Sequence, residues 1–295
     1  MRFLALTVLL FASIAGANTV YRYQDEQGRW HFSDRKPDRA HDTLVVATAA
    51  VEPPEPQLIY QRQADGSQVL TSVNPWPAPV QFEVRVNGER LTTWVVGPRA
   101  AEPVVHQGQP LGWLSDYEYR YLLGKPIPKG DAQPLLPPVP PKGKFRISQG
   151  FNGHYSHKEE PSRHAVDIVM QVGEGIHAAR DGVVVNVKDD YHMGGTDKFF
   201  FDKANYVRVL HDDDTFGIYA HILLGSAQVK PGDRVKAGDL LASAGTSGYS
   251  TGPHLHFAIQ RNNGDNIVSE PFQFQWGRGV LKPATGQWLS REDPN

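Results

Sequence analysis

The sequence predicts an all-β protein whose largest part is an antiparallel β-sheet domain near the C-terminal end. From Phe145 onward, short apolar runs alternate with turn residues, and no stretch of useful length has the 3.6-residue period of an amphipathic helix. The chain is also rich in residues that end regular structure, with 28 glycines and 23 prolines among 295 residues. This composition indicates many turns and linkers, as is typical of β domains.

The N-terminal segment 1–17 has the pattern of a secretory signal peptide. Arg2 precedes an apolar stretch that ends in small residues at Ala15 and Ala17. The stretch is too short to span a bilayer, and no later stretch is apolar for long enough to do so. We therefore expect a periplasmic or secreted protein with no membrane span. The chain has no cysteine, so neither a lipid-modified N-terminal cysteine nor a disulfide framework is expected.

Residues 18–50 predict a small β-hairpin module with one aromatic face. Tyr21 and Tyr23 alternate with polar residues, a DEQG turn follows, and Trp30 and Phe32 alternate on the return strand. The segment resembles a short module of unknown function at the start of many exported bacterial proteins. Because a lone hairpin is only marginally stable, we expect these aromatic residues to pack on a neighbouring domain rather than to bind cell-wall glycan.

Residues 57–133, after the linker-like stretch VEPPEP, predict a small β-sandwich. Its clearest part is VQFEVRVNGERLTTWVV, in which Asn87 and Gly88 supply the positive φ angles of a type I′ hairpin turn. Three apolar residues at alternate positions share one face of the first strand: Phe82, Val84 and Val86. No group of residues in this segment indicates catalysis.

Residues 144–290 predict the antiparallel β domain itself, after a proline-rich stretch at 134–143 that predicts a stiff linker. Two segments of the domain, VGEGIHAARDGVVV and VKPGDRVKAGDLLASAG, each place a strand after a glycine-containing turn. Their weak similarity indicates a duplicated β motif. The formal net charge of −2 at pH 7 provides no basic surface, so nucleic acid is not an expected partner.

Histidines concentrate in this domain. Seven of the chain's 12 histidines lie between residues 154 and 221, and His254 and His256 follow in the stretch GYSTGPHLHF. Two residues apart in a strand, their side chains lie on the same face. Asp167 lies in the apolar run HAVDIVM, where an unpaired carboxylate would be costly. Because a catalytic zinc typically binds three protein ligands from histidine and carboxylate side chains, the pattern predicts a zinc site.

Three blocks of the domain resemble the lysostaphin-type (LytM-like) zinc metallopeptidases, which cut peptidoglycan cross-bridges or stem peptides. In the expected order they are GFNGHYSHKEEPSRHAVDIVMQVGEGIHAARDGVVV, ANYVRVLHDDDTFGIYAH and GTSGYSTGPHLHF. The resemblance covers roughly residues 145–275. It implies an exported zinc metalloendopeptidase that hydrolyses peptide bonds of peptidoglycan by metal-activated water. It also implies a compact antiparallel β fold of the duplicated hybrid motif type, with a groove over the sheet.

Carried over residue by residue, the resemblance makes Asp167 and His256 ligands of Zn2+. It makes His221 and His254 the catalytic pair that activates the water and stabilises the oxyanion. The third ligand departs from the usual family pattern, which has a histidine four residues before the aspartate, because this chain has Arg163 there.

Two histidines compete for the place of the third ligand. His164 lies three residues before Asp167, so it would point to the opposite face of a regular strand. His157 lies ten residues before Asp167 and needs the KEEPSR loop to bring it back. In relatives that resemble this chain, the earlier histidine is the ligand. We therefore favour His157 over His164, with His154 a distant third.

An alternative function exists within the same fold. Some LytM-like proteins have lost metal ligands and act as non-catalytic modules that activate cell-wall amidases. This chain keeps Asp167, His221, His254 and His256, which favours the enzyme. The expected partners are therefore peptidoglycan and, in addition, cell-wall amidases or another regulatory protein. The sequence does not predict which peptidoglycan bond is cut.

Overall fold

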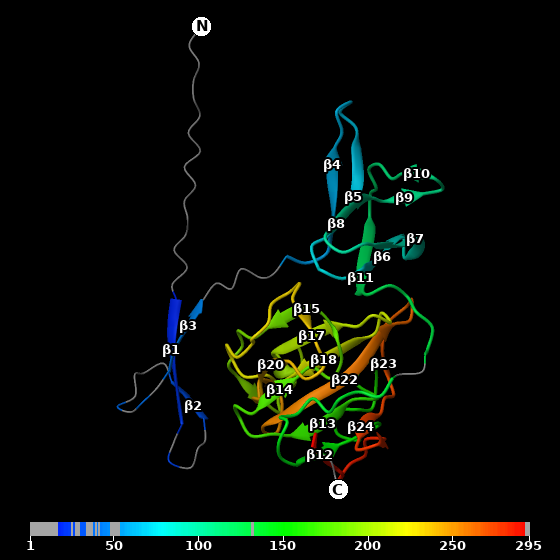
Figure 1. The fold of residues 1–295 in the computed structure, drawn as a ribbon. Helices are drawn as coiled ribbons and strands as arrows, with labels where there is room; N and C mark the ends of the chain where they lie inside the picture. Colours follow the sequence, from blue (N-terminus) through cyan, green and yellow to red (C-terminus); the bar gives the residue numbers. More distant parts are fainter. Residues whose placement is uncertain are drawn as a thin grey trace. The chain divides into compact units, whose positions relative to one another are not determined.

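The computed structural model describes residues 17–24, 26, 30–33, 38, 40, 42–47, 54–130 and 133–292. The chain divides into two compact units, Met1–Pro53 and Pro54–Asn295 (Figure 1). Nearly all regular structure in the described ranges is β, apart from the short 3-10 helix η1 (Lys198–Phe200). The all-β prediction is thus confirmed. Within the same ranges, no helix has the length and hydropathy needed to cross a bilayer. Residues 1–16 of the expected signal peptide lie outside the described residues.

The first unit contains a three-stranded antiparallel sheet. Its order is β2 (Trp30–Ser33), β1 (Ala17–Gln24) and β3 (Asp42–Ala47). Arg22 stands opposite Phe32 in the register of β1 and β2. Because opposite positions belong to one face and neighbouring positions alternate, the Phe32 position shares a face with Arg22 and not with Tyr21 or Tyr23. The prediction of a single aromatic face is therefore wrong. Register decides which positions share a face, because a shift of one residue inverts every face.

The second unit begins with two small sheets that share a core. One sheet contains β4 (Gln57–Arg62), β5 (Gln68–Asn74) and β8 (Ala100–Pro103). The other has the order β11 (Tyr117–Leu123), β6 (Val80–Val86) and β7 (Glu89–Val96). A short hairpin joins β9 (Val105–His106) to β10 (Gln109–Pro110). Buried residues of both sheets pack together: Leu58, Leu70, Val80, Phe82, Val84, Val96 and Val104.

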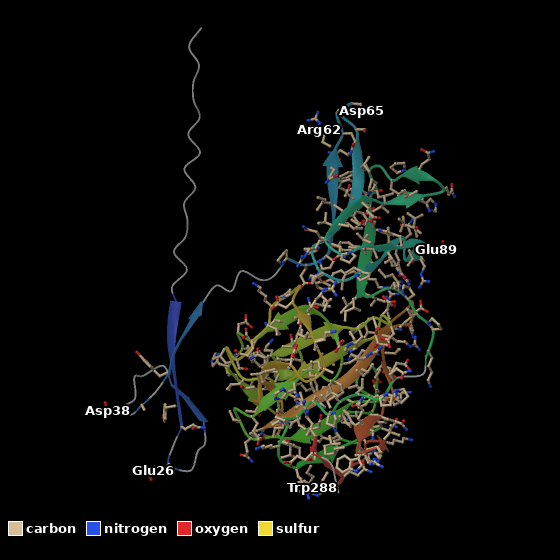
Figure 2. All side chains as sticks on the ribbon, in the orientation of Figure 1. Glu26, Asp38, Arg62, Asp65, Glu89 and Trp288 are labelled. Carbon is tan, nitrogen blue, oxygen red and sulfur yellow. The ribbon has the colours of Figure 1, made fainter. Side chains whose placement is uncertain are left out.

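The β6–β7 hairpin confirms the predicted turn. Asn87 and Gly88 have φ angles of 52° and 78°, both in the left-handed region that this turn requires. Charged, exposed side chains occupy the hairpin ends, with Arg62 and Asp65 on the β4–β5 hairpin and Glu89 on the β6–β7 hairpin (Figure 2). The sandwich core and the turns thus follow from alternation and turn chemistry.

The rest of the second unit is organised around a nine-stranded antiparallel sheet, in which β22 (His254–Asn262) is the longest strand (Figure 1). Its order is β19 (Arg234–Val235), β15 (Gly182–Lys188), β17 (Tyr206–Leu210), β18 (Phe216–Ala220), β22, β13 (Val166–Val169), β12 (Phe145–Gln149) and β26 (Trp288–Leu289), with β23 (Ile267–Glu270) also paired to β22. Three strand pairs surround it: β14 (Gly175–His177) with β20 (Leu240–Ser243), β16 (Gly194–Gly195) with β21 (Gly248–Tyr249), and β24 (Phe274–Trp276) with β25 (Gly279–Leu281).

The proline-rich segment 134–143 belongs to this domain. Leu135 and Val139 are buried in the same core as Phe257 and Phe274. The backbone of Leu135 also donates to the carbonyl of Gln273 at 2.9 Å. The interpretation of this segment as a linker is therefore wrong. Its prolines favour an extended backbone, but its two apolar side chains find a core that composition alone does not reveal.

A buried polar contact joins the sandwich to the far end of β22. The Asn262 side-chain nitrogen donates to Gln81 Oε1 at 2.8 Å and to the carbonyl of Gly124 at 3.0 Å. Gln81 in turn donates to the carbonyl of Gly264 at 2.7 Å. Gln81 and Asn262 are both buried. One strand therefore carries the two histidines of interest at its start and this junction at its end.

Candidate metal centre

The sheet register brings Asp167 and His256 together. β13 and β22 are antiparallel neighbours, and Asp167 stands directly opposite His256. Opposite residues of such a pair have side chains on one face, and here the Asp167 Oδ1 and His256 Nδ1 atoms are 2.9 Å apart. The strand on the other side of β22 places Ala220 opposite His256. His221, the next residue, is thereby brought to the same region.

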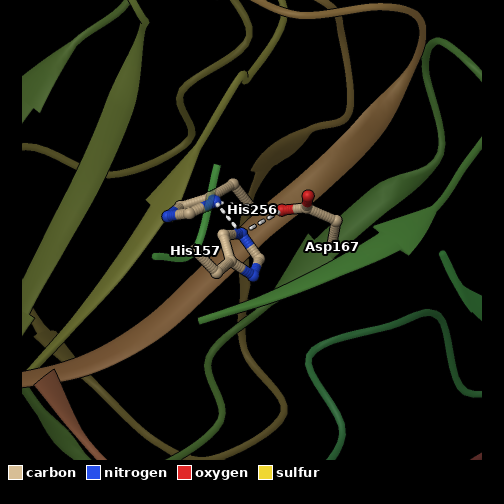
Figure 3. Close-up of side chains that lie close together, drawn as sticks. All are labelled: His157, Asp167 and His256. Atoms are coloured by element: carbon tan, nitrogen blue, oxygen red, sulfur yellow. Dashed lines mark hydrogen bonds and ion pairs between the residues drawn. The ribbon is translucent and has the colours of Figure 1, made fainter. Parts of the chain in front are cut away.

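His157 completes a cluster of three (Figure 3). It lies in the loop between β12 and β13, and its side chain is fully buried. Its Nε2 atom is 3.1 Å from Asp167 Oδ1 and 3.3 Å from His256 Nδ1. One ligand atom from each of the three side chains lies within 4.8 Å of the other two. The loop therefore returns His157 to the aspartate, as the sequence interpretation requires.

His164 and His154 take other positions. The His164 ring Nδ1 is 3.0 Å from the carbonyl of Ser269, and its backbone nitrogen donates to the Ser269 hydroxyl at 2.9 Å. His154 is exposed. Of the three histidines considered for the third ligand, His157 is the one that contacts Asp167 and His256.

The donor set of the cluster fits a metal ion such as zinc. The Nδ1 atom of His157 is 3.1 Å from the carbonyl of Gly150. Because a carbonyl only accepts, this contact places the ring proton on Nδ1 and leaves Nε2 of the neutral ring with a lone pair. That lone pair faces the Asp167 carboxylate, so a proton or a metal cation must lie between the acceptors. Two imidazole nitrogens and one carboxylate oxygen are typical ligands of catalytic zinc.

The environment keeps Asp167 ionised. Burial alone would raise the pKa of its carboxyl group. Hydrogen bonds to the rings of His157 and His256, together with the charge of His256, outweigh the burial and hold the pKa well below its ordinary value. The carboxylate is therefore available as an anionic ligand across the neutral pH range.

His221 and His254 stand beside the cluster with their rings prepared in the same way. Nδ1 of His221 is 2.6 Å from the carbonyl of Ser247, and Nδ1 of His254 is 2.8 Å from the carbonyl of Gly252. The two ring centroids are 4.5 Å apart. The His254 Nε2 atom lies 3.7 Å from Asp167 Oδ1.

Burial favours the neutral form of both of these histidine rings. It lowers the pKa of His221 to about 3, with the neighbouring His254 and His256 adding to the effect. It also lowers the pKa of His254. In addition, His221 has a φ of 64°, a conformation that costs non-glycine residues about 1–3 kcal/mol and is frequent at functional sites.

A groove of about 940 Å3 runs over the cluster. Asp167, His221, His254 and His256 lie in its lining. The rest of the lining includes aromatic side chains at Tyr155, Phe201 and Tyr249. It also includes charged side chains at Lys158 and Glu159. The groove therefore connects these histidines with solvent.

Two further histidines of the domain, His177 and His211, contact backbone carbonyls. Nδ1 of His177 is 2.8 Å from the carbonyl of Gly238, and Nδ1 of His211 is 2.9 Å from the carbonyl of Asp181. Sequence reasoning did not single out Gln149, whose Nε2 donates to Asp167 Oδ2 at 2.9 Å. A glutamine at the end of a short strand carries no signal for such a role.

Protein-family models match two parts of the chain. A model of peptidase family M23 matches residues 161–268, a segment that includes Asp167, His221, His254 and His256. The domain that contains this segment is called the M23 domain below. A second model, of a domain of unknown function (DUF4124), matches residues 6–58. This agrees with the resemblance seen at the N-terminal module.

Several relatives are similar to the M23 domain. The chain is 33% identical over 129 residues to an uncharacterized metalloprotease of Buchnera aphidicola, covering 43% of this chain and 31% of that protein. It is 32% identical over 125 residues to glycyl-glycine endopeptidase ALE-1 of Staphylococcus capitis, covering 42% and 32%. It is 30% identical over 123 residues to peptidoglycan DD-endopeptidase ShyA of Vibrio cholerae, covering 41% and 26%.

The chain thus aligns with between about a quarter and a third of the length of these curated relatives. Among solved structures, the catalytic domain of lysostaphin from Staphylococcus simulans matches at 25% identity with a TM-score of 0.28. That match covers 41% of this chain and 80% of the lysostaphin domain.

Proposed function

We propose that the protein is an exported zinc metalloendopeptidase that hydrolyses peptide bonds of peptidoglycan. The convergence of His157, Asp167 and His256 beneath an open groove carries this proposal. In it, these three side chains hold Zn2+, and His221 and His254 are the catalytic histidines. The names of the relatives, which include a glycyl-glycine endopeptidase and a peptidoglycan DD-endopeptidase, support a cross-link or stem peptide as substrate.

The bound metal supplies Lewis acidity toward the carbonyl of the scissile peptide bond. The chain supplies the remaining functions. With Nδ1 of His254 and His221 directed at backbone carbonyls, each neutral ring keeps Nε2 free to accept a proton from the attacking water. The protonated ring then donates to the leaving amine or the developing oxyanion. Burial lowers the pKa of both rings, so each is neutral at physiological pH and its Nε2 atom carries the lone pair that a proton acceptor needs.

The proposal also assigns the rest of the chain. Residues 1–17 are the signal peptide, which takes the protein to the periplasm or outside the cell. The modules at 18–50 and 57–133 position the enzyme on the cell wall or bind a regulatory partner such as an amidase. The M23 domain, together with the packed segment 134–143, carries the chemistry.

The decisive experiment measures zinc content and the release of soluble fragments from purified peptidoglycan. Wild type is expected to bind one zinc and to release new fragments, whose masses identify the bond. His256→Ala is expected to lose zinc and activity, because it removes a ligand. His254→Ala is expected to keep zinc and to lose cleavage by about 100-fold or more, because it removes an acid–base group.

His106→Ala serves as the matched control, since His106 lies in the sandwich and is expected to change neither quantity. Retained hydrolysis in His256→Ala would contradict the proposal. A wild-type chain with neither zinc nor products would favour the alternative, a non-catalytic module that activates amidases. Stoichiometric zinc without products would indicate an enzyme that its own N-terminal modules inhibit or that needs a partner.

A further inference from the structure

We propose that Gln149 is a positioning residue of the metal centre, which ties the Asp167 carboxylate to the loop that presents His157. This inference rests on the proposed function, because it assumes that the three-residue cluster binds zinc. Three separate features of the structure carry it: the register of β12, the hydrogen bonds of the amide, and the packing of Gly153.

The register of β12 places Gln149 beside the aspartate through an irregularity. Ile147 stands opposite Ile168, and Gln149 stands opposite Asp167. Two steps along β12 therefore match one step along β13, and Ser148 is the extra residue. In a regular pair Ser148 would stand opposite Asp167, and Gln149 would point to the other face. Bulges of this kind re-aim side chains next to active sites. Here the bulge turns Gln149 toward the cluster.

The Gln149 amide then uses both of its ends. Its Nε2 donates to Asp167 Oδ2 at 2.9 Å and to the Ser156 hydroxyl at 2.7 Å. Its Oε1 accepts the backbone N–H groups of Tyr155 at 3.0 Å and Ser156 at 3.4 Å. One side chain therefore connects a sheet residue with the backbone directly before His157.

This division of contacts suits a metal ligand. Oδ2 of Asp167 is engaged by Gln149, while Oδ1 faces His157 and His256. A neutral donor on the outer oxygen fixes the rotation of the carboxylate without competing for the inner oxygen. Such outer partners of metal ligands typically contribute 10–100-fold to metal affinity.

Gly153 supplies the space for the Gln149 side chain. A Cβ atom at residue 153 would lie 2.2 Å from Gln149 Cγ and 2.6 Å from its Cδ. No side chain larger than hydrogen fits while Gln149 keeps this position. The carbonyl of Gly153 also accepts the backbone N–H of His157 at 3.0 Å. The loop is thus built closely around the glutamine.

The test measures zinc affinity of the full chain by competition with a chromophoric chelator. Gln149→Met keeps the bulk of the side chain and removes its hydrogen bonds. We expect it to weaken zinc binding by about 10–100-fold, with the unfolding temperature of the zinc-free chain close to that of wild type. Gln287→Met is the matched control, because Gln287 also accepts a loop N–H, that of Ala284, but lies outside the cluster. It should leave zinc affinity unchanged.

A double-mutant cycle distinguishes positioning from general loop stability. Gly153→Ala in the wild-type background should weaken zinc binding, because the added methyl displaces Gln149. In the Gln149→Ala background the same substitution has no side chain to displace, so it should cause little further loss. Should Gln149→Met fail to fold, this cycle tests the same contact from the other side.

The outcomes separate this inference from the proposed function. Wild-type zinc affinity in Gln149→Met, with zinc lost in His256→Ala, would overturn the role of Gln149 and leave the metal centre standing. Additive losses in the cycle would also overturn it. A wild-type chain that binds no zinc would overturn both proposals.

Discussion

The two buried carboxylates Glu83 and Asp167 differ in the side chains that contact them. Glu83, with a side-chain exposure of 2%, is within 3.0 Å of guanidinium nitrogens of Arg85, Arg90 and Arg120. Arginine is always charged, so this contact is permanent and structural. Asp167 instead faces two histidine rings, and histidine is a common metal ligand. The same functional group thus has a structural role in the sandwich and, in the proposed function, a metal-binding role in the other domain.

At this scale we predict that Glu83→Gln lowers the stability of the sandwich, by about 1–2 kcal/mol because the arginines are partly exposed. Burial would raise the Glu83 pKa, but the guanidinium groups of Arg120 and Arg85 lower it from 4.5 to about 2. A lowered pKa in the folded state stabilises the fold above pH 4.5, and the contribution is lost as the pH falls toward 2. Urea unfolding at pH 7, 5 and about 3 measures this.

In that experiment, the difference between wild type and Glu83→Gln should be largest at pH 7 and shrink at the lowest pH. Exposed Glu89 offers a control substitution to glutamine with little effect. A difference that grows on acidification would contradict the assignment.

Residue-level reasoning from the sequence was strong for the histidines and weak for their supports. Strand parity separated His157 from His164, and the structure places His157 at the cluster. The ligand and catalytic roles themselves stay predictions. The position of Gln149 could not be predicted from the sequence. Its orientation depends on a bulge at Ser148, and no residue type indicates that bulge.

At the scale of elements, Gly245 is the point where the segments that carry His221 and His254 meet. The N–H of Gly245 donates to the carbonyl of His221 at 3.0 Å, and its carbonyl accepts the N–H of His254 at 3.4 Å. A Cβ atom here would lie 2.8 Å from the backbone nitrogen and Cα of Leu223. Backbone cannot rotate away as a side chain can, so the neighbouring segment would have to shift.

We therefore predict that Gly245→Ala reduces peptidoglycan cleavage by about 100-fold, since a displacement near 1 Å is enough for such a loss. Zinc binding should persist, because the hydrogen bonds of Gly245 join His221 and His254 and do not involve the three proposed zinc ligands. Parallel measurements of kcat/KM and zinc content check this. Gly130→Ala is the control, because Gly130 lies outside the groove lining and an added Cβ there would have nothing within 4 Å. Full activity in Gly245→Ala would contradict the prediction.

Features of elements that depend on alternation and turn residues were predicted well from the sequence. Features that depend on how two strands pair were predicted poorly. The Asn87–Gly88 turn followed from residue type alone. The face on which the Trp30 and Phe32 positions lie relative to Tyr21 and Tyr23 did not, because it depends on the register of β1 with β2. Register is a property of two strands, and one strand's composition does not contain it.

At the scale of the whole second unit, Asn262 joins the sandwich to the M23 domain. We predict that Asn262→Ala lowers the stability of the unit by about 1–3 kcal/mol, because the buried Gln81 Oε1 atom and the Gly124 carbonyl both lose the donor that Asn262 supplies. Zinc affinity should be unchanged, since His256 lies near the opposite end of β22. Urea unfolding and chelator competition measure the two effects.

Exposed Asn266, substituted in the same way, is the control and should change neither quantity. Equal stability of Asn262→Ala and wild type would show that the junction does not contribute. The sequence could not predict this contact. Gln81 and Asn262 are 181 residues apart, and neither residue type indicates that the two side chains meet. For the same reason it favoured a linker at 134–143, where the chain is in fact packed.

The three residues of the proposed centre come from supports of unequal stiffness. Asp167 and His256 are neighbours in the middle of a sheet, whereas His157 belongs to a connection between strands. Ion exchange in such a centre would depend on the connection more than on the strands, because the strand pairing fixes Asp167 and His256 opposite each other and His157 is the one residue of the three outside it. Capture and release of the metal then become local events, with a speed that can evolve through the loop sequence while the sheet stays unchanged.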